Sequence, residues 1–237
     1  MRVEKFFTAS DLQAIEAAVH EAEKRTSGEI VPCAVAHSDH YEAAAWKGAV
    51  LGAFAAVVAA AATRYFGDFW GAPALGWITL PPLIGGALGY AAAALVRPLK
   101  LALAGRAHVE YRVHQRAAEA FLENEVFKTR DRTGVLVFLS LYERRVVVLG
   151  DAGINAHVEQ HEWDAVVAGI VAGMRAGQPG QALGAAIARC GELLERRGVA
   201  IRADDTDELP DKLQRRGVAI RADDTDELPD KLRMQEE

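Results

Sequence analysis

Acidic residues flank two predicted strands at positions where they could bind a cation. Asp131 precedes the apolar run 133–141, and Asp151 follows the apolar run 144–149. Runs joined by so few residues must form an antiparallel hairpin, in which the start of one strand lies beside the end of the other. Asp131 and Asp151 are therefore predicted neighbours. Carboxylates suit calcium, which takes about six to eight oxygen ligands. A shared calcium site is one interpretation, and solvated loop carboxylates are the other.

Glu143, between the same two strands, is a further hard oxygen donor at a strand connection. The turn Gly150-Asp151-Ala152-Gly153 leads from a strand into a helix, where free amides could hold a phosphate or a carboxylate. The Gly-x-x-Gly spacing alone is weak. A plain turn in which glycine supplies positive φ is the favoured interpretation.

Two histidines also have a spacing that could serve a metal. His157 and His161 lie one helical turn apart, and Glu162 and Asp164 follow. A zinc site is conceivable on that spacing, but the metalloprotease pattern HExxH is absent because Ala165 stands three residues after Glu162. A polar first helical turn is the favoured interpretation.

The remaining polar groups give no catalytic set. The acidic run 204–207 faintly resembles an aspartate-phosphatase motif, although a solvated tail explains it more simply. His37, Asp39 and His40 are expected in a loop next to the membrane segment described below. No serine or cysteine nucleophile with a partnered base is visible, so we assign no catalytic and no cofactor-binding residue.

The strands that position the two aspartates are predicted to be buried on both faces. Runs 133–141 and 144–149 are continuously apolar, which requires helices above and below the sheet. A further strand is expected at 29–36, where Pro32 argues for an edge position or a bulge. The fold class is therefore α/β, a small mixed sheet sandwiched by helices. The expected helices are 9–26, 107–126, about 156–176 and about 178–197.

A long apolar block interrupts this pattern at 43–97. Two uncharged stretches predict transmembrane helices at about 44–64 and 74–96, each long enough to cross a bilayer. The alternative is a pair of buried core helices. A domain this small could hardly bury two helices of that length, which favours the membrane.

The cations beside the hairpin predict its orientation. Lys47 precedes the first span, and Arg97, Lys100 and Arg106 follow the second, whereas the connecting loop carries one charge of each sign. The excess of cations places both flanks in the cytoplasm. The N-terminus has no apolar run of signal-peptide length. We therefore expect a multi-pass protein of a bacterial inner membrane with a cytoplasmic domain.

The predicted organisation has three parts: a discontinuous α/β domain at 1–42 plus 106–197, the hairpin at 43–97, and an acidic tail at 196–237. The segment 196–213 recurs unchanged as 215–232. Two identical copies indicate a tandem duplication or an error in the gene model rather than a solenoid. High charge density and the absence of an apolar face predict that the tail is disordered.

Charge and cysteine content exclude some classes of protein. The net charge is −6 over 237 residues, which argues against a nucleic-acid partner. Cys33 and Cys190 show no pairing or ligand spacing and fit reduced, structural thiols. A single distant disulfide is the less favoured alternative.

The soluble segments resemble the TPM domain family. The resemblance runs through FFTASDLQAIEAAVHEAEKRTSGEIV (6–31) and KTRDRTGVLVFLSLYERRVVVLGDAGI (128–154), then the helix around Trp163 and the ELPD tail. RTGVL and ERRV are its specific part. The resemblance implies a helix-flanked mixed sheet, a domain often tethered to membranes, and the calcium binding and acid phosphatase activity of a plant relative. The chain departs from secreted members in its hairpin and in the missing signal peptide.

Two functions follow as hypotheses. The first is a membrane-anchored TPM-domain protein that acts as a non-catalytic module, binding other membrane proteins or maintaining membrane complexes. The alternative is a metal-dependent, calcium-linked hydrolase of acid-phosphatase type, a phosphomonoesterase that would use Asp131 and Asp151 as metal ligands.

Overall fold

The structure, a computed structural model, describes residues 6–66, 75–197, 209 and 213–216. Its centre is a four-stranded sheet in the order β3-β2-β1-β4. β1 pairs in parallel with both β2 and β4, and β2 pairs antiparallel with β3. The predicted mixed sheet and the β2–β3 hairpin are thereby confirmed. The strands are β1 (Glu29–Val35), β2 (Gly134–Ser140), β3 (Arg145–Gly150) and β4 (Gln214–Arg216).

β1 contains Pro32, a residue without an N–H to donate, although the strand lies inside the sheet. The Glu29 N–H donates to Thr133 O on the β2 side, whereas the Ile30 N–H donates to the Glu23 carboxylate on the other side. Because strand residues alternate, the position of the missing Pro32 N–H also faces away from β2. β4 pairs only from Cys33 onward, so Pro32 lies where this side of β1 has no partner strand. The expected edge position is therefore local to the first half of β1.

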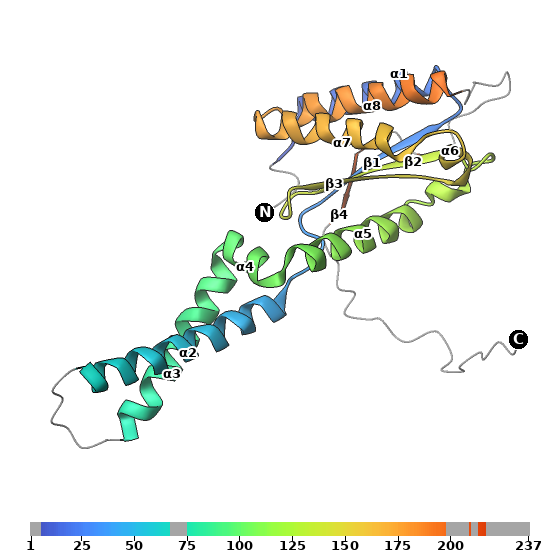
Figure 1. The fold of residues 1–237 in the computed structure, drawn as a ribbon. Helices are drawn as coiled ribbons and strands as arrows, with labels where there is room; N and C mark the ends of the chain where they lie inside the picture. Colours follow the sequence, from blue (N-terminus) through green and yellow to red (C-terminus); the bar gives the residue numbers. More distant parts are fainter. Residues whose placement is uncertain (1–5, 67–74, 198–208, 210–212, 217–237) are drawn as a thin grey trace, which may run out of the picture.

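Helices cover both faces of the sheet, as the apolar strands predict (Figure 1). One face carries α1 (Ala9–Glu23), α7 (Gln160–Arg175) and α8 (Pro179–Arg196), and the other carries α5 (Arg106–Glu123). Alternate strand residues enter each layer: Val135 and Val137 pack under the three helices, whereas Leu136 and Phe138 pack with α5. The core is thus two apolar layers separated by the sheet.

The sequence also sets where these helices begin. α1 starts with a capping box in which the Thr8 hydroxyl accepts from the Asp11 N–H (3.1 Å) and the Asp11 carboxylate accepts from the Thr8 N–H (2.9 Å). α7 has the same arrangement between Glu159 and Glu162. α8 starts at Pro179, where a missing N–H leaves no helical bond unmade.

The two cysteines lie on opposite sides of the sheet. Cys33 packs in the α5 layer and Cys190 in the α8 layer, and neither forms a disulfide. The alternative of a distant disulfide is therefore excluded. Complete burial raises the pKa of the Cys190 thiol to about 12. That thiol is a packing group rather than a nucleophile.

Two long helices form the hairpin, α2 (Glu42–Phe66) and α3 (Leu75–Leu95), which projects away from the sheet (Figure 1). Both are long and apolar enough to span a membrane. Only 17% of the most apolar stretch of α2 and 6% of that of α3 are buried, so they are not core helices. Glycines let them touch: a Cβ added to Gly52 would lie 2.2 Å from Gly85 O. Small residues at a helix contact are typical of membrane hairpins.

A short helix after the hairpin, α4 (Arg97–Ala104), was not predicted. Val96 leaves the helical region and Pro98 occupies the first turn, so α4 is separated from α3 by a bend. The Lys47 ammonium of α2 donates to Leu103 O at 3.1 Å and satisfies a carbonyl at the end of α4. Two further short elements are η2 (Val126–Lys128) and α6 (Ala152–Asn155).

Part of the predicted tail lies in the sheet. β4 extends the sheet beside β1, and Leu213 immediately before it is buried in the core layer of α1 and α8. Leu209 packs against the opposite layer. The sequence did not predict this strand. The rest of the tail, including the acidic run 204–207, lies outside the described residues, and its predicted disorder stays a prediction.

The glycine contacts of the hairpin can be tested with a matched pair of substitutions. In Gly89→Ala the new Cβ would lie 2.2 Å from Gly48 O, whereas in Gly86→Ala it would lie 3.5 Å from Ala49 O. We expect Gly89→Ala to lower stability by about 1–3 kcal/mol through overpacking. Gly86→Ala should be neutral or slightly stabilising, because alanine favours helices. Thermal unfolding in detergent, followed by circular dichroism, provides the comparison, and equal midpoints would contradict the packing.

Candidate functional site

At one end of the sheet, Asp151 connects β3 to α6. Its N–H donates to Gly134 O at 2.9 Å, which closes the hairpin beside the start of β2. Its Oδ1 accepts from the Ala152 N–H at 2.7 Å, so the side chain caps α6. The carboxyl group is almost fully buried, at 6% exposure. Asp151 is thus a structural cap in addition to a candidate ligand.

Arg132 occupies both oxygens of that carboxylate. Its Nε lies 2.6 Å from Asp151 Oδ2 and its Nη2 lies 3.0 Å from Oδ1. Arg132 takes a positive φ of 59°, which directs the chain back from Asp131 into β2. A cation could use Asp151 only by displacing this bidentate guanidinium. Arg132 is the first residue of the RTGVL motif, but its pairing with Asp151 was not predicted, because charge alone does not show where a side chain points.

Asp131 lies beside the same turn. A Cβ added to Gly153 would lie 2.4 Å from Asp131 O, so the two chain segments touch. The Asp131 side chain is exposed. Among the described residues, no group of three or more His, Cys, Asp or Glu side chains is placed to hold a metal. The shared calcium site at Asp131 and Asp151 stays a prediction.

The histidines next to this turn take part in local contacts. His157 Nδ1 lies 2.9 Å from Gly153 O, and His161 lies 3.2 Å from the Glu159 carboxylate at the surface. Trp163, two residues further on, is buried in the core. His161 lies in the polar first turn of α7, which a buried face follows, as the sequence favours. The expected helix at about 156–176 begins only at Gln160, so His157 lies in the turn before it.

The opposite end of the sheet holds a buried carboxylate, Glu143. Its Oε1 accepts from the Ser38 N–H at 3.1 Å, and its Oε2 accepts a very short hydrogen bond from the Ser140 hydroxyl. The Ser38 and Ser140 hydroxyls lie 2.7 Å apart. All three residues are at most 6% exposed. They join the carboxyl ends of the parallel strands β1 and β2, the edge at which open sheets often bind ligands.

Tyr41 and His37 complete this end of the sheet. Tyr41 is 3% exposed, and burial followed by the nearby Glu143 carboxylate raises the pKa of its phenol. Burial and the adjacent His40 ring, whose centroid lies 4.6 Å from that of His37, lower the pKa of His37. His37 therefore stays neutral under conditions where an exposed histidine would begin to gain a proton. Asp39, in the same loop, is paired with Arg112 at 2.5 Å.

The buried residues Ser38, Ser140 and Glu143 are hydrogen-bonded to one another. A substrate would have no access to the Glu143 carboxylate without local opening, so the arrangement serves as a joint rather than an open reaction centre. The joint fastens the loop that leaves β1 for the hairpin to the turn between β2 and β3. Sequence analysis placed His37, Asp39 and His40 in that loop but missed Ser38 and Ser140. Both serines lie at the carboxyl ends of the parallel strands: Ser140 is the last residue of β2, and Ser38 follows the end of β1.

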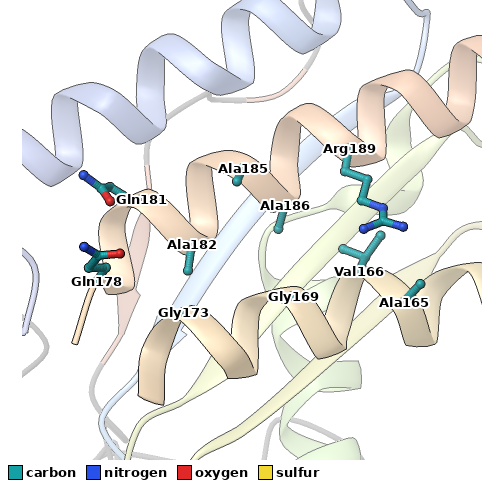
Figure 2. Close-up of a pocket in the computed structure, with 10 residues that line it drawn as sticks. All are labelled: Ala165, Val166, Gly169, Gly173, Gln178, Gln181, Ala182, Ala185, Ala186 and Arg189. Atoms are coloured by element: carbon teal, nitrogen blue, oxygen red, sulfur yellow. The ribbon is translucent and has the colours of Figure 1, made fainter. Parts of the chain in front are cut away.

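A third feature is a groove between α7 and α8 of about 270 Å³. Figure 2 shows it flanked by small side chains, with the Arg189 side chain at one end and two glutamines at the other. A Cβ added to Gly169 would meet nothing within 4 Å, which reflects how open the groove is. It lies away from Asp131, Asp151 and Glu143, and its lining offers no acid, base or nucleophile. We assign it no chemistry.

The fold and this site define a class: a helix-flanked mixed α/β domain whose sheet is built from both sides of an apolar helical hairpin. Residues 105–193 match the family model of the TPM domain, the family that the sequence resembles. The match spans α5 to α8, and α1 and β1, which precede the hairpin, complete the same sheet and helical layer.

A solved structure shows the same fold. The chain is similar to the NMR structure of the BA42 protein from the psychrophilic bacterium Bizionia argentinensis, with a TM-score of 0.54 and 21% sequence identity. The similarity covers 90% of this chain and 98% of that one. No curated protein matches the chain significantly. The comparisons therefore support the domain and its fold.

The predicted calcium site can be tested by replacing Arg132, whose guanidinium would compete with calcium for the Asp151 carboxylate. Arg132→Gln removes the guanidinium from both carboxylate oxygens of Asp151 and leaves the Ala152 N–H as the donor to Oδ1. We expect calcium to raise the unfolding midpoint of Arg132→Gln more than that of the wild-type chain, because ligands that bind the folded state stabilise it. Asp151→Asn should lose the effect. An unchanged midpoint in both the wild-type chain and Arg132→Gln, measured by calorimetry with and without calcium, would rule the site out.

The joint at Glu143 makes a separate prediction. Glu143→Ala leaves the buried Ser38 N–H without its acceptor, and we expect a loss of about 1–3 kcal/mol in the free energy of unfolding. Glu110→Ala is the control, because its half-exposed carboxylate pairs with Arg145 at the surface and should contribute about 0–1 kcal/mol. Denaturant titration in detergent measures both. Equal losses of unfolding free energy in the two variants would contradict a larger contribution from the buried carboxylate of Glu143.

Proposed function

We propose that the chain is a membrane-anchored TPM-domain protein whose hairpin crosses the bacterial inner membrane and holds the domain at the cytoplasmic surface. In this role the domain is a non-catalytic module that binds other membrane proteins or maintains their complexes. The observation that carries the proposal is the apolar surface of α2 and α3, which neither the domain nor the partner helix covers.

That surface is too large for a water-soluble protein. The exposed apolar patch on a typical soluble domain is about 300–600 Å². Here ten large apolar side chains of the two helices are at least 47% exposed. Lipid is the solvent that such a surface fits. The residues are Val50, Leu51, Phe54, Val57 and Val58 on α2, and Ile78, Leu80, Leu83, Ile84 and Leu88 on α3.

The orientation rests on charge. Lys47, Arg97, Lys100 and Arg106 stand at the domain end of the hairpin, against Arg64 alone near the far end of α2. An excess of cations beside a span marks its cytoplasmic side. The domain is therefore proposed to face the cytoplasm.

A non-catalytic role is supported by what the polar groups at the sheet ends already do. Asp151 caps α6 and binds Arg132, and Glu143 bonds to Ser38 and Ser140. In a metal-dependent phosphomonoesterase, the Asp151 carboxylate would have to leave Arg132 to bind the metal. Few other protein oxygens would be available to complete the coordination of that metal. The partner-binding module requires no such rearrangement.

The anchoring role predicts the behaviour of a shortened chain. Gly48 and Ala93 are neighbours across the hairpin, since a Cβ on Gly48 would lie 2.5 Å from Ala93 Cβ. Replacing 49–92 with a short Gly/Ser linker should therefore remove the lipid-facing part and leave a soluble domain that unfolds cooperatively. The full chain should stay in the membrane fraction after alkaline extraction.

Two outcomes would contradict the anchor. Release of the full chain by alkaline extraction would mean that the hairpin does not span the bilayer. Failure to recover any soluble, cooperatively unfolding product from the shortened chain would mean that the hairpin is part of the folding core. Crosslinking of the full chain in its native membrane, with the shortened chain as control, then identifies the partner proteins.

A further inference from the structure

The hairpin meets the domain at a region that we call the elbow. It comprises α4, Lys47 in the first turns of α2, Arg106 at the start of α5 and the β2–β3 turn with Tyr142 and Arg144. In Figure 1, α4 lies between the hairpin and α5. A membrane crossed by α2 and α3 would place the elbow at the level of the lipid headgroups.

The elbow has an inner and an outer apolar face. Leu101, Leu103 and Ala104 of α4 pack against the core layer of α5. On the outer side Leu99 is 38% exposed, and it continues the exposed positions Leu95 and Val96 at the end of α3. The outer face of α4 therefore extends the lipid-facing surface of the hairpin past the end of the span, as in helices that lie in the interface.

Cations without carboxylate partners surround this face. Within the described residues, no carboxylate lies at ion-pair distance from Lys47, Arg97, Lys100, Arg106 or Arg144. Many cations of the domain are paired instead, such as Arg112 with Asp39, Arg116 with Glu123, Arg132 with Asp151, Arg145 with Glu110 and Arg197 with Glu162.

Two of these cations, Arg97 and Lys47, are held in place by hydrogen bonds. Arg97 Nε donates to Tyr142 O at 2.5 Å, and its guanidinium lies 5.5 Å from the centre of the Tyr142 ring. Lys47 is fixed to Leu103 O. Burial, followed by repulsion from the Arg144 guanidinium, lowers the pKa of Arg97, whereas Tyr142 and the Glu143 carboxylate act in the opposite direction. An anion placed near both would relieve that repulsion.

We propose that the elbow binds the phosphate groups of anionic phospholipids, so that the domain is docked on the membrane surface as well as tethered to it. The inference rests on the proposed membrane hairpin. Lipid, rather than a soluble anion, follows from position: the cations border an exposed apolar face that is continuous with the spans. The cytoplasmic leaflet is also the one that carries anionic lipid.

The test uses the full chain in nanodiscs containing equal amounts of phosphatidylcholine and phosphatidylglycerol. Lipids retained after release into detergent are counted by native mass spectrometry. The variant K100Q/R106Q/R144Q removes three elbow cations and leaves the Arg97–Tyr142 contact intact. The control R175Q/R189Q/R196Q removes the same charge from the exposed surfaces of α7 and α8.

We expect the wild-type chain and the control to retain phosphatidylglycerol in preference to phosphatidylcholine. Each cation at an anionic surface contributes about fivefold in affinity. The elbow variant should therefore lose most of the preference, a drop of about tenfold or more. Inorganic phosphate added at the same total phosphate concentration should not displace the lipid.

The outcomes separate the two proposals. If the chain resists alkaline extraction but shows no preference, or if the elbow variant keeps the preference, the headgroup site is overturned and the anchor stands. Displacement by inorganic phosphate would overturn a lipid site in favour of a soluble anion. If the chain does not remain in the membrane at all, both proposals fail.

Discussion

The parallel pairing of β1 and β2 is the constraint on which the rest of the structure depends. Parallel neighbours need a crossover that returns the chain to the same end of the sheet, and a helix usually supplies it. Here α5 is that helix, since it packs on the sheet between β1 and β2 in sequence. The hairpin and α4 are inserted into the same crossover, before α5. The parallel pairing of β1 and β2 therefore fixes the point in the chain at which the apolar helices leave the domain.

That point of departure explains the polar joint. Where β1 ends, the chain must turn from the sheet toward the hairpin, and the backbone amide of Ser38 can no longer bond to a neighbouring strand. Glu143 supplies the acceptor, and the Ser140 hydroxyl holds the same carboxylate from the end of β2. A buried N–H left without an acceptor is costly. The cluster satisfies polar groups that burial in the domain removes from water.

The sequence predicts most elements because their periodicity is clear, and the exceptions have physical causes. α4 was not predicted because its alanines and leucines directly follow the second predicted span, so that the local sequence does not distinguish a separate helix from the flank of the span. β4 was missed because local sequence does not decide it: the pair Arg-Arg ends α8 at 196–197 and recurs in the strand at 215–216. The adjacency of the Asp131 and Asp151 segments could be predicted from hairpin geometry. The guanidinium of Arg132 could not, because it depends on the direction of one side chain.

The joint and the elbow act on the same turn from opposite sides. The Glu143 side chain connects the β2–β3 turn to Ser38 inside the domain. Arg97 of α4 donates to the carbonyl of the preceding residue of that turn, Tyr142. The turn thus connects the register of the sheet with the end of the second apolar helix. A hairpin attached only through a loop would let the domain swivel, whereas two contacts on one turn limit that freedom. Because the sheet, the joint and the elbow are linked in series, the direction of the hairpin sets the direction that the α1, α7 and α8 layer faces. In the proposed anchored state, that layer is the surface that we propose for a partner.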